Sequence, residues 1–279
     1  MPRLAVLGWP VSHSRSPAMQ NVALAELGLA GEWRYEAIEV VPEQFEPLVR
    51  SLPGDGFAGV NVTVPHKLAA LALADRGSEA AREIGAANTL SFAAGAIEAE
   101  NTDAAGLLGA LATDPSGMRA LVLGAGGSGR ACVWALTRAG AQVSIWNRTE
   151  AKAQALAAEF GATAIPSDER RATSAASDLL INATTVGLAA ANADPTAPAQ
   201  NSPDLKALPI AADAIHERQI VVDLVYGSAP TPLAAAAGSR GARVIDGLEV
   251  LVHQGAASLR IWTGLEPPLE TMRKAAREA

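Results

Sequence analysis

A glycine-rich stretch at residues 119–152 constrains the fold of this 279-residue chain more than any other segment. A short apolar run at 120–123 predicts a buried strand, and Gly124, Gly126 and Gly129 follow it with the spacing G-x-G-x-x-G. Apolar residues then recur every three or four positions, which predicts a helix, and a second apolar run predicts another strand. This strand–turn–helix–strand unit is typical of dinucleotide binding, with the pyrophosphate at the helix N-terminus. A glycine-rich turn without a ligand is the alternative.

The residues that end the second strand, predicted at 143–146, indicate which dinucleotide is bound. NAD sites usually have a carboxylate here for the ribose 2′-hydroxyl, but this chain has Asn147, Arg148 and Thr149. The guanidinium of Arg148 can hold a 2′-phosphate through two parallel hydrogen bonds, and Lys152 adds a second positive charge. These residues predict NADP rather than NAD. A helix N-cap at Thr149 flanked by surface charges is the alternative, and it is compatible with phosphate binding.

Length and composition bound the class of protein. The chain is longer than one hydrophobic core usually allows, so we expect two domains. The net charge of −7 argues against nucleic acid or an anionic membrane as the main partner. The single cysteine, Cys132, rules out an intrachain disulfide, fits a reducing compartment and suits a small buried apolar position. With no apparent secretory leader and no apolar run near ~18 residues, we expect a cytoplasmic protein. The histidines lack metal-ligand spacing, so no metal is expected.

Hydroxyl groups gather ahead of the first predicted helix. Ser12, Ser14 and Ser16 alternate before Pro17, which suits a first helical turn with Ser16 as its N-cap. Hydroxyls at a helix N-terminus can receive a carboxylate group. Capping within a polar turn accounts for the same residues, so both interpretations stay open at this point.

Two charged residues are predicted at the starts of helices. Residues 60–64 alternate between apolar and polar as a strand does, and Pro65 is placed to begin a helix, so Lys67 lies in its first turn. The helix dipole disfavours a cation there, and α/β sheets place ligands at strand C-termini, which favours a function for Lys67. Asp103 precedes another predicted helix, where an N-cap role competes with a functional one.

The remaining pattern organises the chain around these residues. Residues 90–100 predict a hairpin that turns at Ala94 and Gly95. Residues 113–117 break the pattern and mark a domain boundary, whereas residues 188–209 are rich in Ala, Pro, Asn and Asp and predict a surface loop. Further strands are predicted at 4–7, 33–40, 162–165, 178–182, 220–224 and 243–245, and a long helix at 248–262.

Over essentially its whole length, the chain resembles the shikimate dehydrogenase family. The resemblance rests on a set of motifs that follow the order of the family. In this sequence they are G-x-P-x-x-H-S-x-S-P (8–17), N-V-T-x-P-x-K (61–67), A-x-N-T (86–89), N-T-D (101–103), the glycine loop, N-R-T-x-x-K (147–152), N-A-T-x-x-G (182–187), D-x-x-Y (223–226), and D-G at 246–247 with a later Gln at 254. Any one of these motifs is weak, but the ordered set is highly specific.

The resemblance implies a two-domain α/β enzyme with a cleft between its domains. The implied α/β substrate-binding domain comprises residues 1–112 and 240–279, and a Rossmann-type parallel-sheet NADP domain comprises residues 113–239. The implied reaction is the reversible, NADPH-dependent reduction of 3-dehydroshikimate to shikimate, on the route to chorismate and the aromatic amino acids. The resemblance also implies a small-molecule substrate and a monomer or homodimer.

Site residues are implied by their match to the motifs. Lys67 and Asp103 are the implied acid–base pair. The implied substrate-binding residues are Ser14, Ser16, Thr63, Asn88, Tyr226 and Gln254. The implied cofactor-binding residues are Gly124, Ala125, Gly126, Gly127, Ser128, Asn147, Arg148, Thr149, Lys152, Leu224 and Gly247.

Two departures from the family pattern affect fine tuning. Gln20 stands where the family often has His, and Val250 where it commonly has Met. A quinate or quinate/shikimate dehydrogenase of the same superfamily is the nearest alternative, and the two N-terminal serines and Arg148 argue against it. A non-catalytic NADP-binding regulator is the other, and the intact pair Lys67 and Asp103 argues against that.

Overall fold

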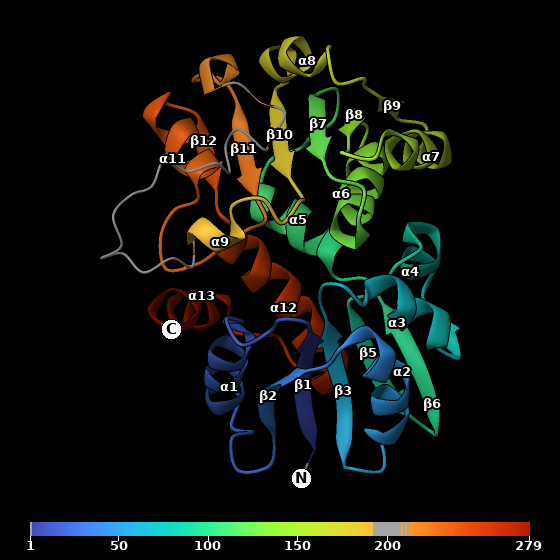
Figure 1. The fold of residues 1–279 in the computed structure, drawn as a ribbon. Helices are drawn as coiled ribbons and strands as arrows, with labels where there is room; N and C mark the ends of the chain where they lie inside the picture. Colours follow the sequence, from blue (N-terminus) through green and yellow to red (C-terminus); the bar gives the residue numbers. More distant parts are fainter. Residues whose placement is uncertain (1, 192–207, 209, 211) are drawn as a thin grey trace. The chain divides into compact units, whose positions relative to one another are not determined.

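The computed structural model describes residues 2–191, 208, 210 and 212–279, which form two compact units (Figure 1). Unit 1 is Met1–Gly109 with Leu251–Ala279, and unit 2 is Ala110–Val250. The chain passes between the units within α5 (Asp103–Leu111) and within α12 (Gly247–Thr263). Residues 110–112 and 240–250 were expected in the substrate-binding domain but lie in unit 2, where β12 pairs with β11.

Unit 1 is built on a mixed six-stranded sheet with the order β2-β1-β3-β5-β6-β4. The strands are β1 (Arg3–Gly8), β2 (Arg34–Glu39), β3 (Phe57–Val62), β4 (Arg76–Gly77), β5 (Thr89–Ala93) and β6 (Ala96–Glu100). β1 pairs in parallel with β2 and β3, whereas β5 runs antiparallel to β3 and β6. The predicted hairpin is confirmed: Ala94 and Gly95 both have positive φ, as a tight two-residue turn between β5 and β6 requires.

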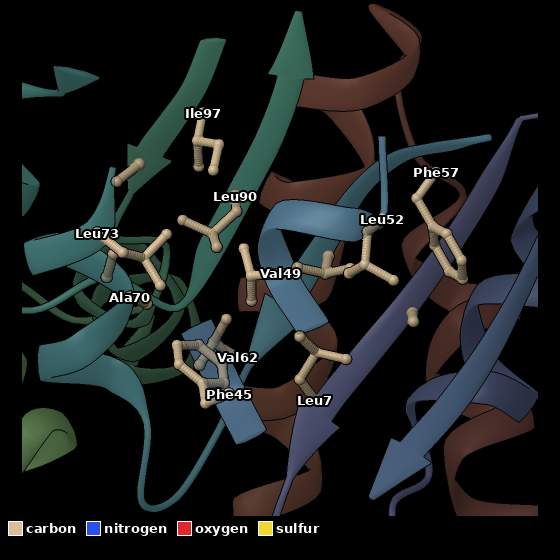
Figure 2. Packing of buried hydrophobic residues seen from close by; sticks show 14 of the residues in the cluster. Leu7, Phe45, Val49, Leu52, Phe57, Val62, Ala70, Leu73, Leu90 and Ile97 are labelled. Atoms are coloured by element: carbon tan, nitrogen blue, oxygen red, sulfur yellow. The ribbon is translucent and has the colours of Figure 1, made fainter. Parts of the chain in front are cut away.

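Unit 1 also contains seven helices or parts of helices among its described residues. Besides α5 and α12 they are α1 (Ser16–Glu26), α2 (Pro42–Ser51), α3 (Lys67–Leu73), α4 (Glu79–Ile84) and α13 (Leu269–Glu278). Figure 2 shows Phe45 and Val49 of α2 and Leu73 of α3 packed on side chains of the sheet. Val60 and Val62 belong to this cluster. Asn61 lies between them in β3, so its side chain points to the opposite face, toward α12.

Unit 2 is built on a fully parallel six-stranded sheet with the order β12-β11-β10-β7-β8-β9. Its strands are β7 (Arg119–Leu123), β8 (Gln142–Trp146), β9 (Thr163–Ala164), β10 (Leu179–Asn182), β11 (Ile220–Asp223) and β12 (Arg243–Ile245). Its helices are α6 (Gly127–Arg138), α7 (Glu150–Phe160), α8 (Arg170–Ala176), α9 (Leu188–Ala191), a 3₁₀ turn (Ala212–Ala214) and α11 (Pro232–Ser239). The chain order reverses between β7 and β10, and such a switch point is where doubly wound sheets bind ligands.

Two local expectations differ from the structure. Ser16 is the first residue of α1 rather than its N-cap, which is Arg15, so the polar turn ends one residue earlier than predicted. Of the loop predicted at 188–209, residues 188–191 form α9, and most of the rest lies outside the described residues.

Cys132 is buried. In the part of the chain that the structure describes, no helix is long and apolar enough to cross a membrane.

Candidate functional site

An ion pair links the starts of two helices in unit 1. Lys67 opens α3 after β3, Asp103 opens α5 after β6, and the Lys67 Nζ lies 2.5 Å from Asp103 Oδ2. The two side chains are only 10% and 15% exposed. A carboxylate at a helix N-terminus is favoured by the helix dipole, whereas an ammonium there is disfavoured. Asp103 therefore compensates for the unfavourable position of Lys67, and the two residues that the sequence singled out separately lie in direct contact.

Asn88 lies between this pair and α12. Its Nδ2 donates to Asp103 Oδ1 at 2.8 Å and is 3.1 Å from Oε1 of Gln254. Its Oδ1 accepts a hydrogen bond from the main-chain N–H of Thr102 at 2.7 Å, and since that group can only donate, the orientation of the amide is defined. Asp103 Oδ1 and Oδ2 thus accept hydrogen bonds from Asn88 and Lys67 respectively. Four of the predicted site residues form one polar cluster.

Because Gly106 has no side chain, α5 can approach α12 closely beside this cluster. A Cβ at Gly106 would lie 2.6 Å from the Gln254 Cβ and 3.0 Å from its main-chain nitrogen, which is closer than real Cβ contacts allow. The side chain of Gln254 is held by a hydrogen bond from its Nε2 to the Leu251 carbonyl at 2.9 Å. Gly106 therefore helps to set the position of Gln254, although the sequence analysis gave it no role.

The other predicted substrate-binding residues of unit 1 lie in the turns after β1 and β3. The Ser16 N–H donates to Ser14 Oγ at 3.3 Å, and the Thr63 N–H donates to the Leu7 carbonyl at 2.9 Å. A Cβ at Gly8 would lie 2.4 Å from Thr63 Cγ2, so Gly8 lets these two turns lie close together. Tyr226, the remaining predicted substrate residue, belongs to unit 2.

His66, next to Lys67, anchors the start of α3. Its ring stacks on Phe45 with centroids 4.4 Å apart, and Nε2 lies 2.8 Å from the Val40 carbonyl oxygen. Burial lowers the pKa of His66, and this outweighs the hydrogen bond to Val40, which raises it. The ring is therefore neutral at pH 7 and donates its Nε2–H to Val40.

The glycine loop of unit 2 has the geometry that the motif predicts. Gly124 has a φ of +110°, and a Cβ there would lie 2.8 Å from the Ala183 carbonyl oxygen in the turn after β10. A Cβ at Gly129 would lie 2.2 Å from the Gly124 carbonyl oxygen, so only glycine lets α6 pack on this turn. Gly126, the N-cap of α6, has open space where a Cβ would be. The turn leaves room for a phosphate at Gly126, with Ala125, Gly127 and Ser128 beside it.

The predicted ribose-phosphate residues follow β8. Asn147 Oδ1 accepts from the Ala125 N–H at 3.2 Å, and its Nδ2 donates to the Thr149 carbonyl at 2.9 Å, so it joins this segment to the glycine loop. The side chains of Arg148, Thr149 and Lys152 are exposed. Thr149 is the N-cap of α7, but without a cap hydrogen bond from its side chain. These groups fit a 2′-phosphate beside the loop.

The last predicted cofactor residues meet at the end of β11. A Cβ at Gly247 would lie 2.5 Å from the Leu224 carbonyl oxygen, so glycine is required for this approach. The segment is held by Asp223, whose carboxylate accepts from Asn182 Nδ2 at 2.8 Å, from Thr231 Oγ1 at 2.5 Å and from the Val225 N–H at 3.1 Å. Burial raises the pKa of Asp223, and these three hydrogen bonds oppose the rise.

Several polar residues that contact the predicted ones were not singled out from the sequence. Asn61, Thr102, Ser258, Asn182 and Asp223 are all buried and hydrogen-bonded. Four of them lie inside motifs quoted for the family, and a polar residue between two buried valines, as at Asn61, is a signal that sequence alone carries. Among the described residues there is no cluster of three or more His, Cys, Asp or Glu side chains suited to a metal ion.

Comparisons with known proteins match both units. A family model described as the shikimate dehydrogenase substrate binding domain matches residues 6–90, shikimate / quinate 5-dehydrogenase matches 109–213, and the shikimate 5'-dehydrogenase C-terminal domain matches 247–277. A shikimate dehydrogenase (NADP(+)) of Thermus thermophilus is 44% identical, over 100% of this chain and 99% of its own length.

Solved structures agree over the whole chain. A shikimate 5-dehydrogenase from Thermus thermophilus in complex with NADP(H) and shikimate is 42% identical with a TM-score of 0.85, covering 100% of this chain and 99% of that one. The 5-ketofructose reductase of Gluconobacter sp. strain CHM43 is 28% identical with a TM-score of 0.80, covering 99% and 98%. The same architecture therefore occurs in enzymes named for different substrates.

Proposed function

The chain belongs to the shikimate dehydrogenase family, and on that premise we propose that it catalyses the reversible NADPH-dependent reduction of 3-dehydroshikimate to shikimate. This makes it an oxidoreductase acting on a CH–OH group, in the route to chorismate and the aromatic amino acids. The observation that supports the proposal best is the cluster of Lys67, Asp103, Asn88 and Gln254 in unit 1. It offers a proton donor, a carboxylate and two amides to a small hydroxylated substrate.

The residues of this cluster have separate roles in the proposed mechanism. When bound, NADPH supplies a hydride to the carbonyl carbon of the substrate. Lys67 donates a proton from Nζ to the oxygen on which negative charge develops, and takes the proton back in the reverse reaction. Asp103 holds the ammonium in place through its hydrogen bond. In this proposal Lys67 supplies the transferred proton, while the Asp103 carboxylate accepts hydrogen bonds from Lys67 and Asn88.

Substrate orientation is assigned to neutral groups. The hydroxyls of Ser14 and Ser16 bind the substrate carboxylate near the N-terminus of α1, where the helix dipole favours an anion. Thr63, Asn88 and Gln254 bind ring hydroxyls, and Tyr226 is a further substrate-binding residue of the proposal. An enzyme of this kind needs no metal, since the ammonium of Lys67 stabilises the developing charge.

The cofactor residues of unit 2 favour NADP. Gly124, Gly126 and the start of α6 bind the pyrophosphate, and Arg148, Thr149 and Lys152 bind the 2′-phosphate. Leu224 and Gly247 contact the nicotinamide end. We further propose that the protein acts in the cytoplasm, a reducing compartment that the single buried cysteine fits, and that it is a monomer or homodimer.

The proposal is tested by following the absorbance of NADPH with purified protein. Shikimate and quinate are each offered with NADP and with NAD, and 5-ketofructose is offered with NADPH. We expect turnover with shikimate and NADP and little with the other combinations. Turnover mainly with quinate and NAD contradicts the assignment of the serines and Arg148, and turnover only with 5-ketofructose places the chain with that reductase. NADP binding without any turnover supports the regulator instead.

A further inference from the structure

A buried polar network lies behind the proposed substrate-binding amides in unit 1. At its centre the hydroxyl of Ser258, on α12, is 2.8 Å from Asn61 Nδ2, 2.9 Å from Thr89 Oγ1 and 3.1 Å from Thr102 Oγ1. Ser258 is fully buried, and it lies one helical turn after Gln254. One hydroxyl thus joins α12 to β3, to β5 and to the turn that precedes Asp103.

The direction of these hydrogen bonds follows from the donors that are present. The Asn88 carbonyl oxygen is 3.2 Å from Asn61 Nδ2 and can only accept, so it defines the orientation of the Asn61 amide. Asn61 Nδ2 therefore donates to the Ser258 hydroxyl, and the Tyr35 hydroxyl donates to Asn61 Oδ1 at 2.8 Å. Ser258 keeps its own proton for the Gln254 carbonyl oxygen at 3.1 Å or for Thr89 or Thr102.

Asn61 also holds the main chain of Asn88. Its Nδ2 lies 3.2 Å from the Asn88 carbonyl oxygen. Thr102, a second partner of Ser258, lies with its Oγ1 2.9 Å from Asn88 Nδ2 and fixes the amide of Asn88 through its main-chain N–H. The network therefore contacts the side-chain amide of Asn88 through Thr102. It reaches Gln254 through its main-chain carbonyl and through Thr102 Oγ1, which is 3.5 Å from Gln254 Oε1.

We infer that Ser258 and Asn61, the latter held by the Tyr35 hydroxyl, are positioning residues that keep the side-chain amides of Asn88 and Gln254 in place to bind the ring hydroxyls of a substrate. The inference rests on the proposed function for the identity of that substrate. Buried networks in which every member is hydrogen-bonded rigidify the groups they contact, and removal of one member leaves the others with unpaired donors or acceptors.

Two substitutions remove single hydroxyls from the network. Ser258→Ala removes its centre. Tyr35→Phe keeps the ring beside Trp262, whose centroid is 6.3 Å away, but removes the donor to Asn61 Oδ1. Thr263→Val is the matched control, because Thr263 lies on the same helix and, among the described residues, its hydroxyl bonds only to the Leu259 carbonyl and the Leu265 N–H. All three lose one partly or fully buried hydroxyl.

The kinetic test separates positioning from general stability. With shikimate and NADP, we expect the KM for shikimate to rise and kcat/KM to fall roughly two- to tenfold in Ser258→Ala and Tyr35→Phe, as loss of one hydrogen bond predicts. The dissociation constant of NADP, followed by fluorescence, stays unchanged, as do all constants of Thr263→Val. A mere loss of folded protein lowers kcat and leaves the KM for shikimate unchanged, and that result overturns the inference. Because the two hydroxyls act in one network, their effects in the double variant are not additive.

A second measurement does not depend on the substrate. The side-chain amide signals of Asn88 and Gln254 in ¹⁵N NMR spectra of the ligand-free protein report on the positions of these groups. We expect them to shift or broaden in Ser258→Ala and Tyr35→Phe and to stay in place in Thr263→Val. Unchanged amide signals in Ser258→Ala and Tyr35→Phe refute the inference even if shikimate is turned over. If the signals shift in these variants but the wild-type protein turns over no shikimate, only the proposed function is contradicted.

Discussion

Removal of the ammonium group from the Lys67–Asp103 pair tests the chemistry and the stability of the site together. Lys67→Met keeps the aliphatic part of the side chain but leaves the Asp103 carboxylate with Asn88 as its remaining side-chain donor. Breaking a fully buried pair by removing one partner costs about 3–5 kcal/mol. Because these side chains are 10% and 15% exposed, water can reach Asp103, and we expect a loss of about 2–3 kcal/mol in the free energy of unfolding.

The effect on catalysis has a different size and a different signature. Loss of a positioned proton donor lowers rates by about 10²–10⁴-fold. Since Lys67 acts on the charge that develops during the reaction, kcat should fall by this factor while the KM for shikimate changes little. The measurements are steady-state kinetics from NADPH absorbance and urea denaturation at pH 7.5.

The double variant Lys67→Met/Asp103→Asn separates the two effects. A neutral amide at position 103 no longer leaves a charge without its partner, so most of the lost stability should return, whereas activity should not. A double variant as unstable as Lys67→Met refutes the argument from the unpaired carboxylate. A value of kcat within tenfold of the wild type in Lys67→Met removes Lys67 from the mechanism.

Two further predictions concern other parts of the chain. Arg148→Ala should reduce the preference for NADP over NAD by roughly ten- to a hundredfold, since a charge-assisted hydrogen bond contributes about 1.5–3 kcal/mol; an unchanged ratio of kcat/KM for the two cofactors contradicts the role of Arg148. His66 should make stability depend on pH, because its pKa is lower in the folded protein than in the unfolded chain. As the pH falls below about 6.5, the unfolded chain takes up a proton at this histidine before the folded protein does. The free energy of unfolding therefore declines until the folded-state pKa is passed. His66→Phe keeps a ring against Phe45 and should flatten this decline in urea titrations at pH 7.5 and 5.5; an equal decline in both proteins shows that other groups cause it.

Local signals were enough for much of the fold. The glycines at 124 and 129 predicted a turn in which a side chain has no room, and the structure shows the clash distances that exclude one. Ala94 and Gly95 predicted the hairpin, and both residues have the positive φ that its turn requires. Such features depend on the backbone within a few residues, so sequence is sufficient to find them.

Short elements and local caps were less predictable. β4, α4 and α8 have no strong period and follow from pairing and packing with neighbours. At Ser16 a serine before a proline predicted an N-cap, but the preceding turn ends at Arg15, and the hydroxyl of Ser14 instead accepts from the Ser16 N–H. A choice between two adjacent polar residues is decided by how the turn is anchored, which a local pattern does not contain.

The sequence by itself determined which residue types are present at the ends of strands, and through the family motifs it indicated the reaction and the cofactor. Only the tertiary structure decided which of them touch: Lys67 and Asp103 are 36 positions apart and Asn61 and Ser258 are 197 apart. Hydrogen bonds over such separations form only after strands and helices have packed, and their directions depend on which donors meet which acceptors. The family motifs implied that Lys67 and Asp103 act together, but their direct contact and the network around Ser258 became apparent only in three dimensions.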